Sequence, residues 1–515
     1  MPAVPRTSRR GLLAAAAGVV AGAAAGTTVA GTRASAAAGT DPLLHLLRRA
    51  SYGPTAESEA EIRSLGAHAW LDRQLSPGTI DDSACATVLK RYPLIYASVP
   101  TIRRRVSSGL MKAHGWDAMM QVAHAAIVRA AWSERQLFEV MTDFWSNHLN
   151  VANPSDGTWD NRQDYDLHVI RPHTFGRFAD MLKASARHPA MLNYLDNRSS
   201  TKTHPNENYA RELLELHTVG LVYSEADVKN AARLLTGLTT TNGGVYAYDG
   251  RRHATGAVRV LTFTHANRTA AGGQAASLNL LDYLAMHPAT ARQIARKLCL
   301  RFVSDDPPPA LVQKLAAVYL TSKTAIVPVL RALFGSAEFA ASEGQKVRRP
   351  FEDLVATIRV LGIGPEQVTT DNPAGTKGVQ ALFWILQGSG HAPLNWAPPN
   401  GYPDVAAAWA SSNGYLSRWN SHMQLAGNWY PKQLTRPASL LDHLVPAIPT
   451  TFGGLVDALT TRITGSVFSD EHRSALTGFF GKTPSSSLAR NHAALNWKFP
   501  YLVALVLSSP EFMVR

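Results

Sequence analysis

The sequence predicts an all-α protein, a large multi-helix fold that carries one small β-hairpin and one ordered loop block. Three observations support this fold class. Apolar residues recur at the three-to-four-residue spacing of amphipathic helices through most of the chain. Only residues 243–263 alternate apolar and polar positions as a strand does. The chain has 515 residues, 45% of them hydrophobic, which is enough for a large core in two or three lobes.

Eight segments with the helical spacing are expected to form helices. They are residues 118–132, 134–149, 176–196, 226–238, 287–303, 309–320, 325–339 and 349–362. A further helix is expected over 206–219, because Asn206 is a good capping residue and Gly220 a common helix stop. The alternating stretch is expected to turn at Asp249–Gly250, a dipeptide typical of hairpins.

Residues 387–431 differ from the rest of the chain in composition. Gly, Pro, Asn, Ser, Trp and Tyr are abundant in this block. Disordered linkers lack tryptophan, so the composition predicts ordered loops braced by aromatic side chains. Long ordered loops on a helical scaffold often carry binding residues.

The first 38 residues are expected to be an export signal. A basic head precedes a run rich in alanine and glycine, and small residues suit cleavage after Ala34-Ser35-Ala36. The pair Arg9-Arg10 resembles the twin-arginine signal, which exports proteins already folded. The alternative is a membrane anchor, which the weakly apolar run disfavours. The mature chain is expected to be secreted or extracytoplasmic, with helical lobes at 39–270 (carrying the hairpin) and 271–515 (carrying the loop block).

The net charge favours an acidic partner. The whole chain carries +13, and removal of the signal, which holds four arginines and no acid, leaves +9. A basic exported protein suits an acidic extracellular polymer or glycan, and an envelope protein is the alternative partner. Nucleic acid is not expected, since no Lys/Arg run is interleaved with aromatics. No transmembrane segment is expected in the mature chain. Cys85 and Cys299 leave open one long-range disulfide or two buried thiols.

The helix at 206–219 combines an acidic edge with a histidine among apolar residues. On a helical wheel Glu207, Arg211, Glu212 and Glu215 share a polar arc. Such a ladder of opposite charges also stabilises an ordinary exposed helix. His217 falls within the apolar face, where its ring nitrogens need hydrogen-bond partners. Glu212 borders the apolar face, so we expect it to be more buried than Glu207.

The helix at 134–149 repeats this arrangement. His148 lies near the centre of its apolar arc, and carboxylates follow one edge. Two core-facing histidines beside carboxylates could converge on a divalent or transition metal held by His148, His217 and Glu212, or form a buried acid–base pair. The alternative is two separate core histidines, each bonded to a backbone carbonyl.

The aromatic block adds candidate binding residues. Trp396, Tyr402 and Trp409 have faces that stack on sugar rings, and Arg418 and Arg211 have guanidinium groups that grip carboxylate or phosphate. Asp404 could complete a carboxylate pair across a cleft. The alternative is that these aromatics wedge the loops onto the helices. No nucleophile elbow, zinc-protease helix, phosphate loop or haem-attachment motif occurs in the sequence.

Long motifs carry a resemblance to a known family. They include "HLLRRASYGPT" (45–55), "DFWSNHLNV" (143–151), "NYLDN" (193–197) and "NENYARELLELHTVGL" (206–221). With these, nearly the whole mature chain resembles the bacterial family called domain of unknown function 1800. The resemblance implies an exported, mostly helical protein with no established general activity, often encoded near sulfatase-like proteins.

The family motifs map onto particular residues of this chain. They place Trp145, His148, Asn206, Glu207, Asn208, Arg211, Glu212 and Glu215 in the family pattern. The family often has His-Asp in the hairpin region, where this chain has His253-Ala254 and therefore lacks that aspartate. Tyr402 stands where the family commonly has tryptophan, which keeps an aromatic ring.

Three functions are therefore open. The first is a hydrolase of an extracellular or cell-envelope glycan or related polymer that uses Glu212, Glu215, Asp404 and His148 in acid–base chemistry. Glu212 and Glu215 stand one turn apart, so they cannot flank a glycosidic bond without a third carboxylate. The second is a metal- or cofactor-binding redox protein that uses His148, His217 and Glu212. The third is a non-catalytic envelope scaffold.

Overall fold

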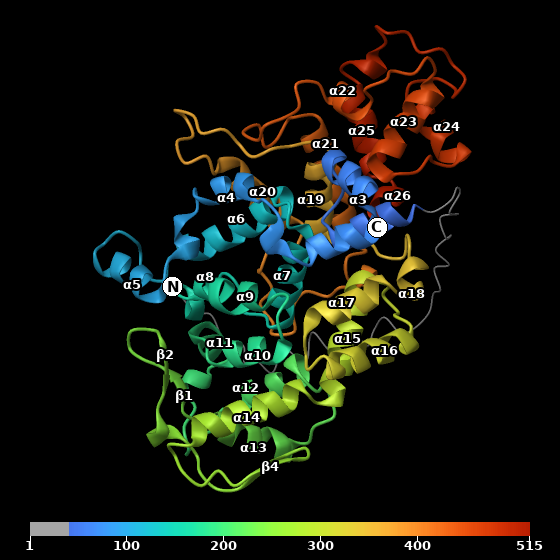
Figure 1. Ribbon diagram of the computed structural model, residues 1–515. Coiled ribbons are helices and arrows are strands. Elements are labelled where there is room, and N and C mark those ends of the chain that lie inside the picture. The colour runs from blue at the N-terminus through green and yellow to red at the C-terminus, as the bar shows by residue number, and fades with distance from the viewer. Residues whose placement is uncertain (1–40) are drawn as a thin grey trace. The chain divides into compact units, whose positions relative to one another are not determined.

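The computed structural model describes residues 41–515 (Figure 1). The predicted export signal at 1–38 lies outside the described residues. The described chain is mostly helical and contains two two-stranded sheets, which confirms the predicted all-α class. Its residues fall within one compact unit. No helix between residues 41 and 515 has both the length and the apolar character needed to cross a membrane.

The helices that precede the strands form the first part of the unit. They are α2 (Pro42–Ala50), α3 (Ala56–Gln74), α4 (Ser83–Leu89), α5 (Val99–Ser107), α6 (Asp117–Trp132), α7 (Gln136–His148), α8 (Arg162–Tyr165), α9 (Arg171–His173), α10 (Phe178–Ala186), α11 (Pro189–Tyr194), α12 (Glu207–Glu212) and α13 (Glu225–Leu235). Two π-helical turns, Asp166–Ile170 and Leu213–His217, follow α8 and α12 directly.

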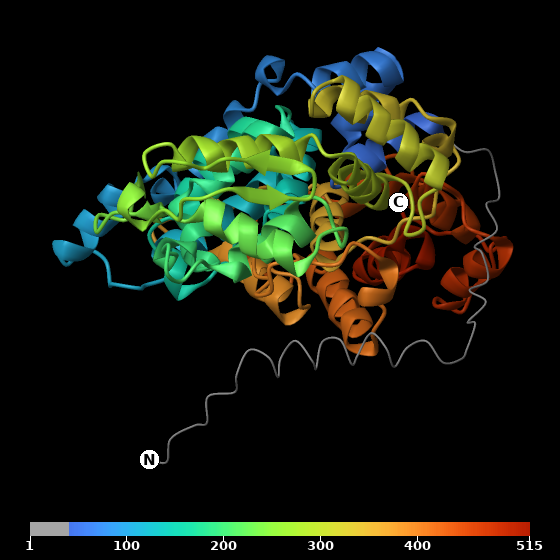
Figure 2. The same cartoon turned by 90° about the horizontal axis from the view of Figure 1, so that it is seen from below.

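Four short strands form two antiparallel pairs. Strand β1 (Leu238–Thr240) pairs with β2 (Tyr246–Tyr248), and β3 (Val258–Val260) pairs with β4 (Phe263–His265). Figure 2 shows the strands beside α13 and α14, with which β3 and β4 make contact. The predicted turn at Asp249–Gly250 is wrong. The Asp249 side chain accepts a hydrogen bond from the Arg251 amide and so caps a 3-10 turn at Gly250–Arg252 instead.

The helices after the strands complete the unit. They are α14 (Gly273–Ala285), α15 (Pro288–Phe302), α16 (Pro309–Thr321), α17 (Ile326–Phe334), α18 (Ala337–Ala340), α19 (Pro350–Val360), α20 (Lys377–Gly388), α21 (Ser412–Ala426), α22 (Leu440–Leu444), α23 (Phe452–Thr464), α24 (Asp470–Gly478), α25 (Phe499–Leu507) and α26 (Pro510–Met513).

All eight predicted helical segments are helical, but two of them are broken. The segment 176–196 divides between α10 and α11 because Pro189 lacks the amide hydrogen that would continue the first helix. The segment 325–339 divides after α17, where Ser336 caps α18. The block at 387–431 is only partly loop, since α21 occupies its second half. Ser411 caps α21, and the buried pair Ser421 and Leu425 lies one turn apart on its inner face.

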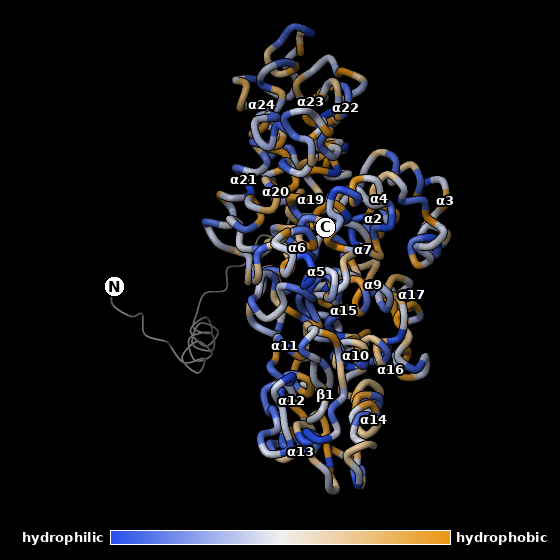
Figure 3. The backbone as a smooth tube through the Cα atoms, turned by 90° about the vertical axis from the view of Figure 1, so that its left-hand side faces the viewer, coloured by the Kyte–Doolittle hydropathy of each residue, from blue (hydrophilic) through white to orange (hydrophobic). Residues whose placement is uncertain are grey.

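One large apolar cluster runs through the unit, from Leu44 in α2 to Phe512 in α26. Figure 3 shows hydrophobic and hydrophilic residues alternating along the same helices, as expected for elements with one buried face. The predicted lobe boundary at residue 270 falls in the loop between β4 and α14, and it stays a prediction. Cys85 and Cys299 are both buried and are not joined in a disulfide.

Candidate functional site

A buried centre of charged side chains lies where α15, α19 and the Asp404 loop meet. Six cations of this centre are at most 4% exposed: Arg49, Arg301, Lys346, Arg348, Arg349 and Arg515. Four carboxylates form ion pairs with them: Asp143, Asp305, Glu352 and Asp404. The two cations without a carboxylate partner, Arg49 and Arg348, donate to backbone carbonyls. We call this set the charge centre.

Glu352 is the hub of the charge centre. Its carboxylate is 1% exposed and accepts a hydrogen bond from the Arg301 guanidinium. It also accepts from the Arg349 backbone amide at 2.9 Å and side chain at 3.2 Å, and lies 3.3 Å from Arg515 Nη2. A buried carboxylate persists as an ion only with such partners. Glu352 therefore fixes three arginines to the start of α19.

Asp404 is an ion-pair partner in this centre. It lies 3.3 Å from Lys346 Nζ and 3.8 Å from Arg301 Nη1. Burial alone would raise the pKa of Asp404, but Arg349, Lys346 and Arg301 outweigh burial and hold it well below its ordinary value. A carboxylate held ionised in this way neither gives nor takes a proton near neutral pH. No ion pair or hydrogen bond within residues 41–515 joins Asp404 to Glu212.

The predicted substrate aromatics pack mainly against each other. The buried His391 ring stacks on Trp409 with centroids 4.7 Å apart, and lies tilted against Tyr402 at 4.3 Å. Trp396 lies 4.9 Å from Tyr402. The polar atoms of the three larger rings donate to Ala392 O, Asn400 Oδ1 and Pro403 O. This packing favours the interpretation that the aromatics wedge the loop onto the helices.

Replacing Tyr402 with alanine should therefore act on stability. We expect the free energy of unfolding to fall by about 3 to 5 kcal/mol, as for other large aromatics truncated in a core. Tyr402→Phe keeps the ring and loses only the hydrogen bond to Ala392, so about 1 kcal/mol is expected. Chemical denaturation measures both changes. An unchanged midpoint in Tyr402→Ala, together with lost ligand binding, would restore the substrate role.

Arg418 is also occupied within the protein. Its Nη2 lies 2.6 Å from Asp353 Oδ1, and His422 Nε2 lies 2.9 Å from Asp353 Oδ2. Burial would raise the pKa of Asp353, but Arg418 and His422 outweigh burial and lower it. These contacts fasten α21 to α19. A role for Arg418 in substrate binding would require this ion pair to open.

His148 caps the π-helical turn that follows α12. Its Nε2 donates to the backbone carbonyl of His217 at 3.1 Å, so its Nδ1 is the nitrogen that accepts from Lys297 Nζ at 2.9 Å. Gln293 donates to the carbonyls of Glu215 and Leu216. A helix end leaves carbonyls without partners, and side chains of α7 and α15 satisfy three consecutive ones here.

The two predicted core histidines do converge, with ring centroids 6.3 Å apart. Burial and the nearby Lys297 lower the pKa of His148 well below its ordinary value and that of His217 to about 3, so both rings are neutral. Both nitrogens of His148 are used, which leaves none for a metal. Among the described residues no three His, Cys, Asp or Glu side chains gather closely enough to hold a metal ion. The structure thus does not assemble His148, His217 and Glu212 as ligands.

Glu212 stands apart from these networks. It is half-buried, as the wheel predicted, whereas Glu207 is exposed. The described residues offer Glu212 no hydrogen bond or ion pair. Burial, followed by the nearby charge of Glu215, raises the pKa of Glu212 to about 7. Glu215 instead accepts a 2.5 Å hydrogen bond from the Tyr223 hydroxyl. Two neighbouring carboxylates therefore differ in environment, and one of them is protonated in part at neutral pH.

The predicted charge ladder along α12 does not form. Arg211 turns away from Glu207 and Glu215 and holds both oxygens of Glu225, at 2.7 and 2.8 Å. The π-helical turn from Leu213 shifts Glu215 off the line that an α-helix would give it. Glu207 precedes that turn and loses Arg211 to Glu225. Arg211 thus joins α12 to α13.

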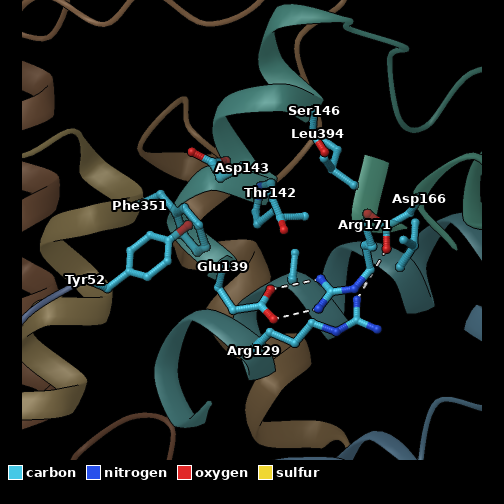
Figure 4. Close-up of a pocket in the computed structure, with 13 residues that line it drawn as sticks. Tyr52, Arg129, Glu139, Thr142, Asp143, Ser146, Asp166, Arg171, Phe351 and Leu394 are labelled. Carbon is cyan, nitrogen blue, oxygen red and sulfur yellow. Dashed lines mark hydrogen bonds and ion pairs between the residues drawn. The ribbon is translucent and has the colours of Figure 1, made fainter. Parts of the chain in front are cut away.

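A small cavity lies on the other side of α7 (Figure 4). Its volume is about 30 Å³, which admits about two water molecules. Arg171 grips both oxygens of Glu139 at 2.6 and 2.9 Å, and Arg129 lies 3.4 Å from Asp166. Asp143 also lines this cavity and forms an ion pair with Arg349 at 2.7 Å. The cavity therefore borders the charge centre and is too small for a sugar.

A larger hollow of about 450 Å³ shares Arg129, Glu139 and Arg171 with that cavity. Charged groups that line this hollow are hydrogen-bonded to other parts of the protein. Arg135 donates to the Ile80 carbonyl, and Asp82 accepts from Ser133 and from the Glu134 amide. Asp81 and Asp82 also line this hollow, and hydrogen bonds from Ser83 lower the pKa of Asp81 while burial raises that of Asp82. Asp82 is held by Ser133 and the Glu134 amide, whereas Glu212 has no partner among the described residues, so we place the candidate acid–base site at Glu212 and Glu215.

The family model for DUF1800, described as a protein of unknown function, matches residues 45–514. The chain belongs to the DUF1800 family. The comparison with curated proteins and that with solved structures each return no match. The family motifs quoted from the sequence contribute side chains to three places in this DUF1800 protein. They are the charge centre, through Arg49 and Asp143, the π-turn cap, through His148, and the carboxylate pair, through Glu212 and Glu215.

Sequence reasoning missed most of the charge centre of this DUF1800 protein. Arg301, Lys346, Arg349 and Glu352 were not singled out. The signal that could have found them is the helix at 349–362, which carries both acids and arginines although its apolar residues predict burial. Every residue of α19 is in fact buried. Charges on a helix buried all round must pair with charges elsewhere in the chain.

Proposed function

We propose that this protein is an exported hydrolase that acts on a cell-envelope glycan or related polymer by carboxylate acid–base chemistry. Glu212 is the general acid, and Glu215, which accepts a hydrogen bond from Tyr223, is its partner. One observation carries the proposal. Glu212 is half-buried without a partner and has a pKa of about 7, while Glu215 beside it is held by Tyr223. Two neighbouring carboxylates in contrasting environments are typical of an acid–base pair.

The arrangement of the pair favours one class of bond. Glycosidic hydrolysis uses two carboxylates on opposite sides of the scissile bond. Glu212 and Glu215 stand one turn apart on one helix edge, and Asp404 is fixed as an ion in the charge centre. Two carboxylates on one side suit an acyl bond, in which one activates water and the other protonates the leaving group, as in an aspartic-protease pair. An ester or amide substituent on the polymer is therefore the proposed target.

A product assay tests this proposal. The mature protein is incubated with an O-acetylated uronate polysaccharide, and released acetate and new reducing ends are measured separately. We expect acetate release without new reducing ends, with activity falling as pH rises through about 7, where Glu212 loses its proton. New reducing ends without acetate would show that the protein cleaves the glycosidic bond and not the acyl bond. If no envelope polymer yields either product, the hydrolase proposal is wrong.

Export is proposed on the sequence of the first 38 residues. If the route is the twin-arginine one, changing Arg9 and Arg10 together to lysine should abolish secretion of the folded protein, because that route requires the arginine pair. Immunoblots of culture medium and cell fractions measure the loss. Changing Arg6 and Arg33 to lysine keeps the same charge and provides the control, which should be secreted normally. Normal secretion of the Arg9/Arg10 variant would exclude this route.

A further inference from the structure

A row of exposed aromatic side chains crosses the surface beside α25. Trp429, Trp497 and Phe479 are 47%, 67% and 44% exposed. Tyr501 lies between the two tryptophans, with ring centroids 5.8 Å from Trp429 and 6.4 Å from Trp497. Lys498 continues the row, with its ammonium 5.2 Å from the Trp497 ring and 5.9 Å from that of Phe479. We call these five residues the aromatic row.

The loop at one end of the row is held in place. Gly427 leaves room for the Trp429 indole, since a Cβ at that position would lie 2.6 Å from the ring. Arg436 donates to Asn428 Oδ1 at 3.1 Å and to the Pro431 carbonyl at 3.3 Å, on either side of Trp429. The indole is thus presented to solvent by an ordered loop. A fixed ring loses little conformational entropy when a ligand covers it.

The row carries positive charge. A lysine follows each exposed aromatic within three residues: Lys432 after Trp429, Lys482 after Phe479 and Lys498 after Trp497. None of the three lysines forms an ion pair within residues 41–515. The two segments that build this surface, 405–441 and 472–510, contain no aspartate or glutamate. A ligand that meets the row therefore meets aromatic faces together with the Lys498 ammonium, and exposed Lys432 and Lys482 follow close in the sequence.

We propose that the aromatic row binds an acidic polysaccharide. The flat, apolar faces of tryptophan and tyrosine cover the apolar faces of sugar rings, and the lysines attract uronate or sulfate groups. A membrane surface would instead call for an amphipathic helix whose apolar face enters the lipid. A nucleic acid would call for many phosphate contacts, and only three lysines follow the row.

The row lies away from the proposed acid–base pair. In Figures 1 and 3 the helices α21 to α24 lie at the opposite end of the unit from α12 and α13. Binding at the row therefore anchors the polymer without touching Glu212 or Glu215. This proposal does not depend on hydrolysis and stands if no activity is found.

Binding to polygalacturonate, a uronate polymer, tests the proposal. Affinity electrophoresis or calorimetry with the mature protein should detect binding that weakens as salt rises. The double change Trp429→Ala and Trp497→Ala should weaken binding about tenfold or more, as for exposed aromatic anchors elsewhere. Trp116→Ala removes a tryptophan that is 52% exposed at the start of α6, and provides the matched control. Its binding should be unchanged.

Further binding measurements decide the ligand class. Lys498→Gln should weaken binding to polygalacturonate and leave the melting temperature unchanged, because its side chain lies on the surface rings. A neutral glucan should bind less tightly than polygalacturonate. Equal binding by the double tryptophan variant and the Trp116→Ala control would overturn the proposal. So would binding confined to anionic phosphatidylglycerol vesicles or to single-stranded DNA.

Discussion

Replacing Glu352 with glutamine should lower the free energy of unfolding by about 3 to 5 kcal/mol, as for other buried ion pairs that lose one partner. The amide has the same shape but no charge, so Arg301, Arg349 and Arg515 lose their shared anion. All three stay in the protein interior, at most 4% exposed. Burial and the neighbouring arginines already lower the pKa of Arg301, yet arginine remains protonated in proteins. The unbalanced positive charge cannot be relieved by proton loss.

Thermal and chemical unfolding of the protein measure this change. Asp470→Asn provides the control, since Asp470 is fully exposed and lies 3.9 Å from Arg473. Surface substitutions of this kind change stability by about 0.5 kcal/mol or less. A Glu352→Gln midpoint as close to wild type as that of Asp470→Asn would show that the charge centre is not a structural ion network. In that case an anionic ligand would be a better explanation of its excess of arginine and lysine.

The ion pairs of the charge centre could not be predicted from the sequence. Apolar spacing predicted the helix of α19 correctly, because that spacing depends on residues within one element. The partners of Glu352 come from α15, from its own first turn and from the last residue of the chain. Nothing in the spacing of α19 indicates which distant cation will reach it. Asp404 illustrates the same limit: it was singled out as a catalytic partner, and the structure surrounds it with cations.

The helix at 206–219 marks a second limit. The wheel correctly half-buried Glu212, which directly precedes the π-helical turn, and buried His217 at the end of that turn. It failed for Glu215, whose predicted partner Arg211 binds Glu225 in α13. A π-helical turn inserts a residue into the α-helical repeat, so positions after it rotate away from the faces that a regular wheel assigns. The helix propensities of residues 206–219 do not indicate that insertion.

Replacing Glu212 with glutamine should lower the turnover of the proposed hydrolysis about 100- to 10,000-fold, the usual contribution of a general acid or base. Glutamine fills the same space and cannot donate a proton to the leaving group. The pH profile supplies an independent check. Wild-type activity should decline as pH rises through about 7, where Glu212 becomes ionised, and residual activity of the variant should lack that decline. Glu207→Gln, an exposed glutamate of the same helix, should keep full activity.

The same substitution should make the protein more stable at neutral and higher pH. The pKa of Glu212 is about 7 in the folded protein and 4.5 in an unfolded chain, so between these values the folded state holds a proton that the unfolded state has lost. Stability therefore falls as pH rises from 4.5 to 7 and does not recover above it. Glutamine removes this loss, which is worth about 1 to 3 kcal/mol once partial solvent exposure is allowed for.

Melting temperatures of wild type and Glu212→Gln at pH 4 and pH 8 separate a functional carboxylate from a structural one. A structural glutamate lowers stability when removed. Replacing Glu212 with glutamine should instead raise the melting temperature at pH 8 and leave it unchanged at pH 4, where the carboxyl is protonated in both states. A side chain that destabilises its own fold persists because it serves another purpose, as catalytic groups held in unfavourable surroundings do. A lower melting temperature of Glu212→Gln than of wild type at pH 8 would show that Glu212 stabilises the fold. The observation that supports the acid–base assignment would then no longer hold.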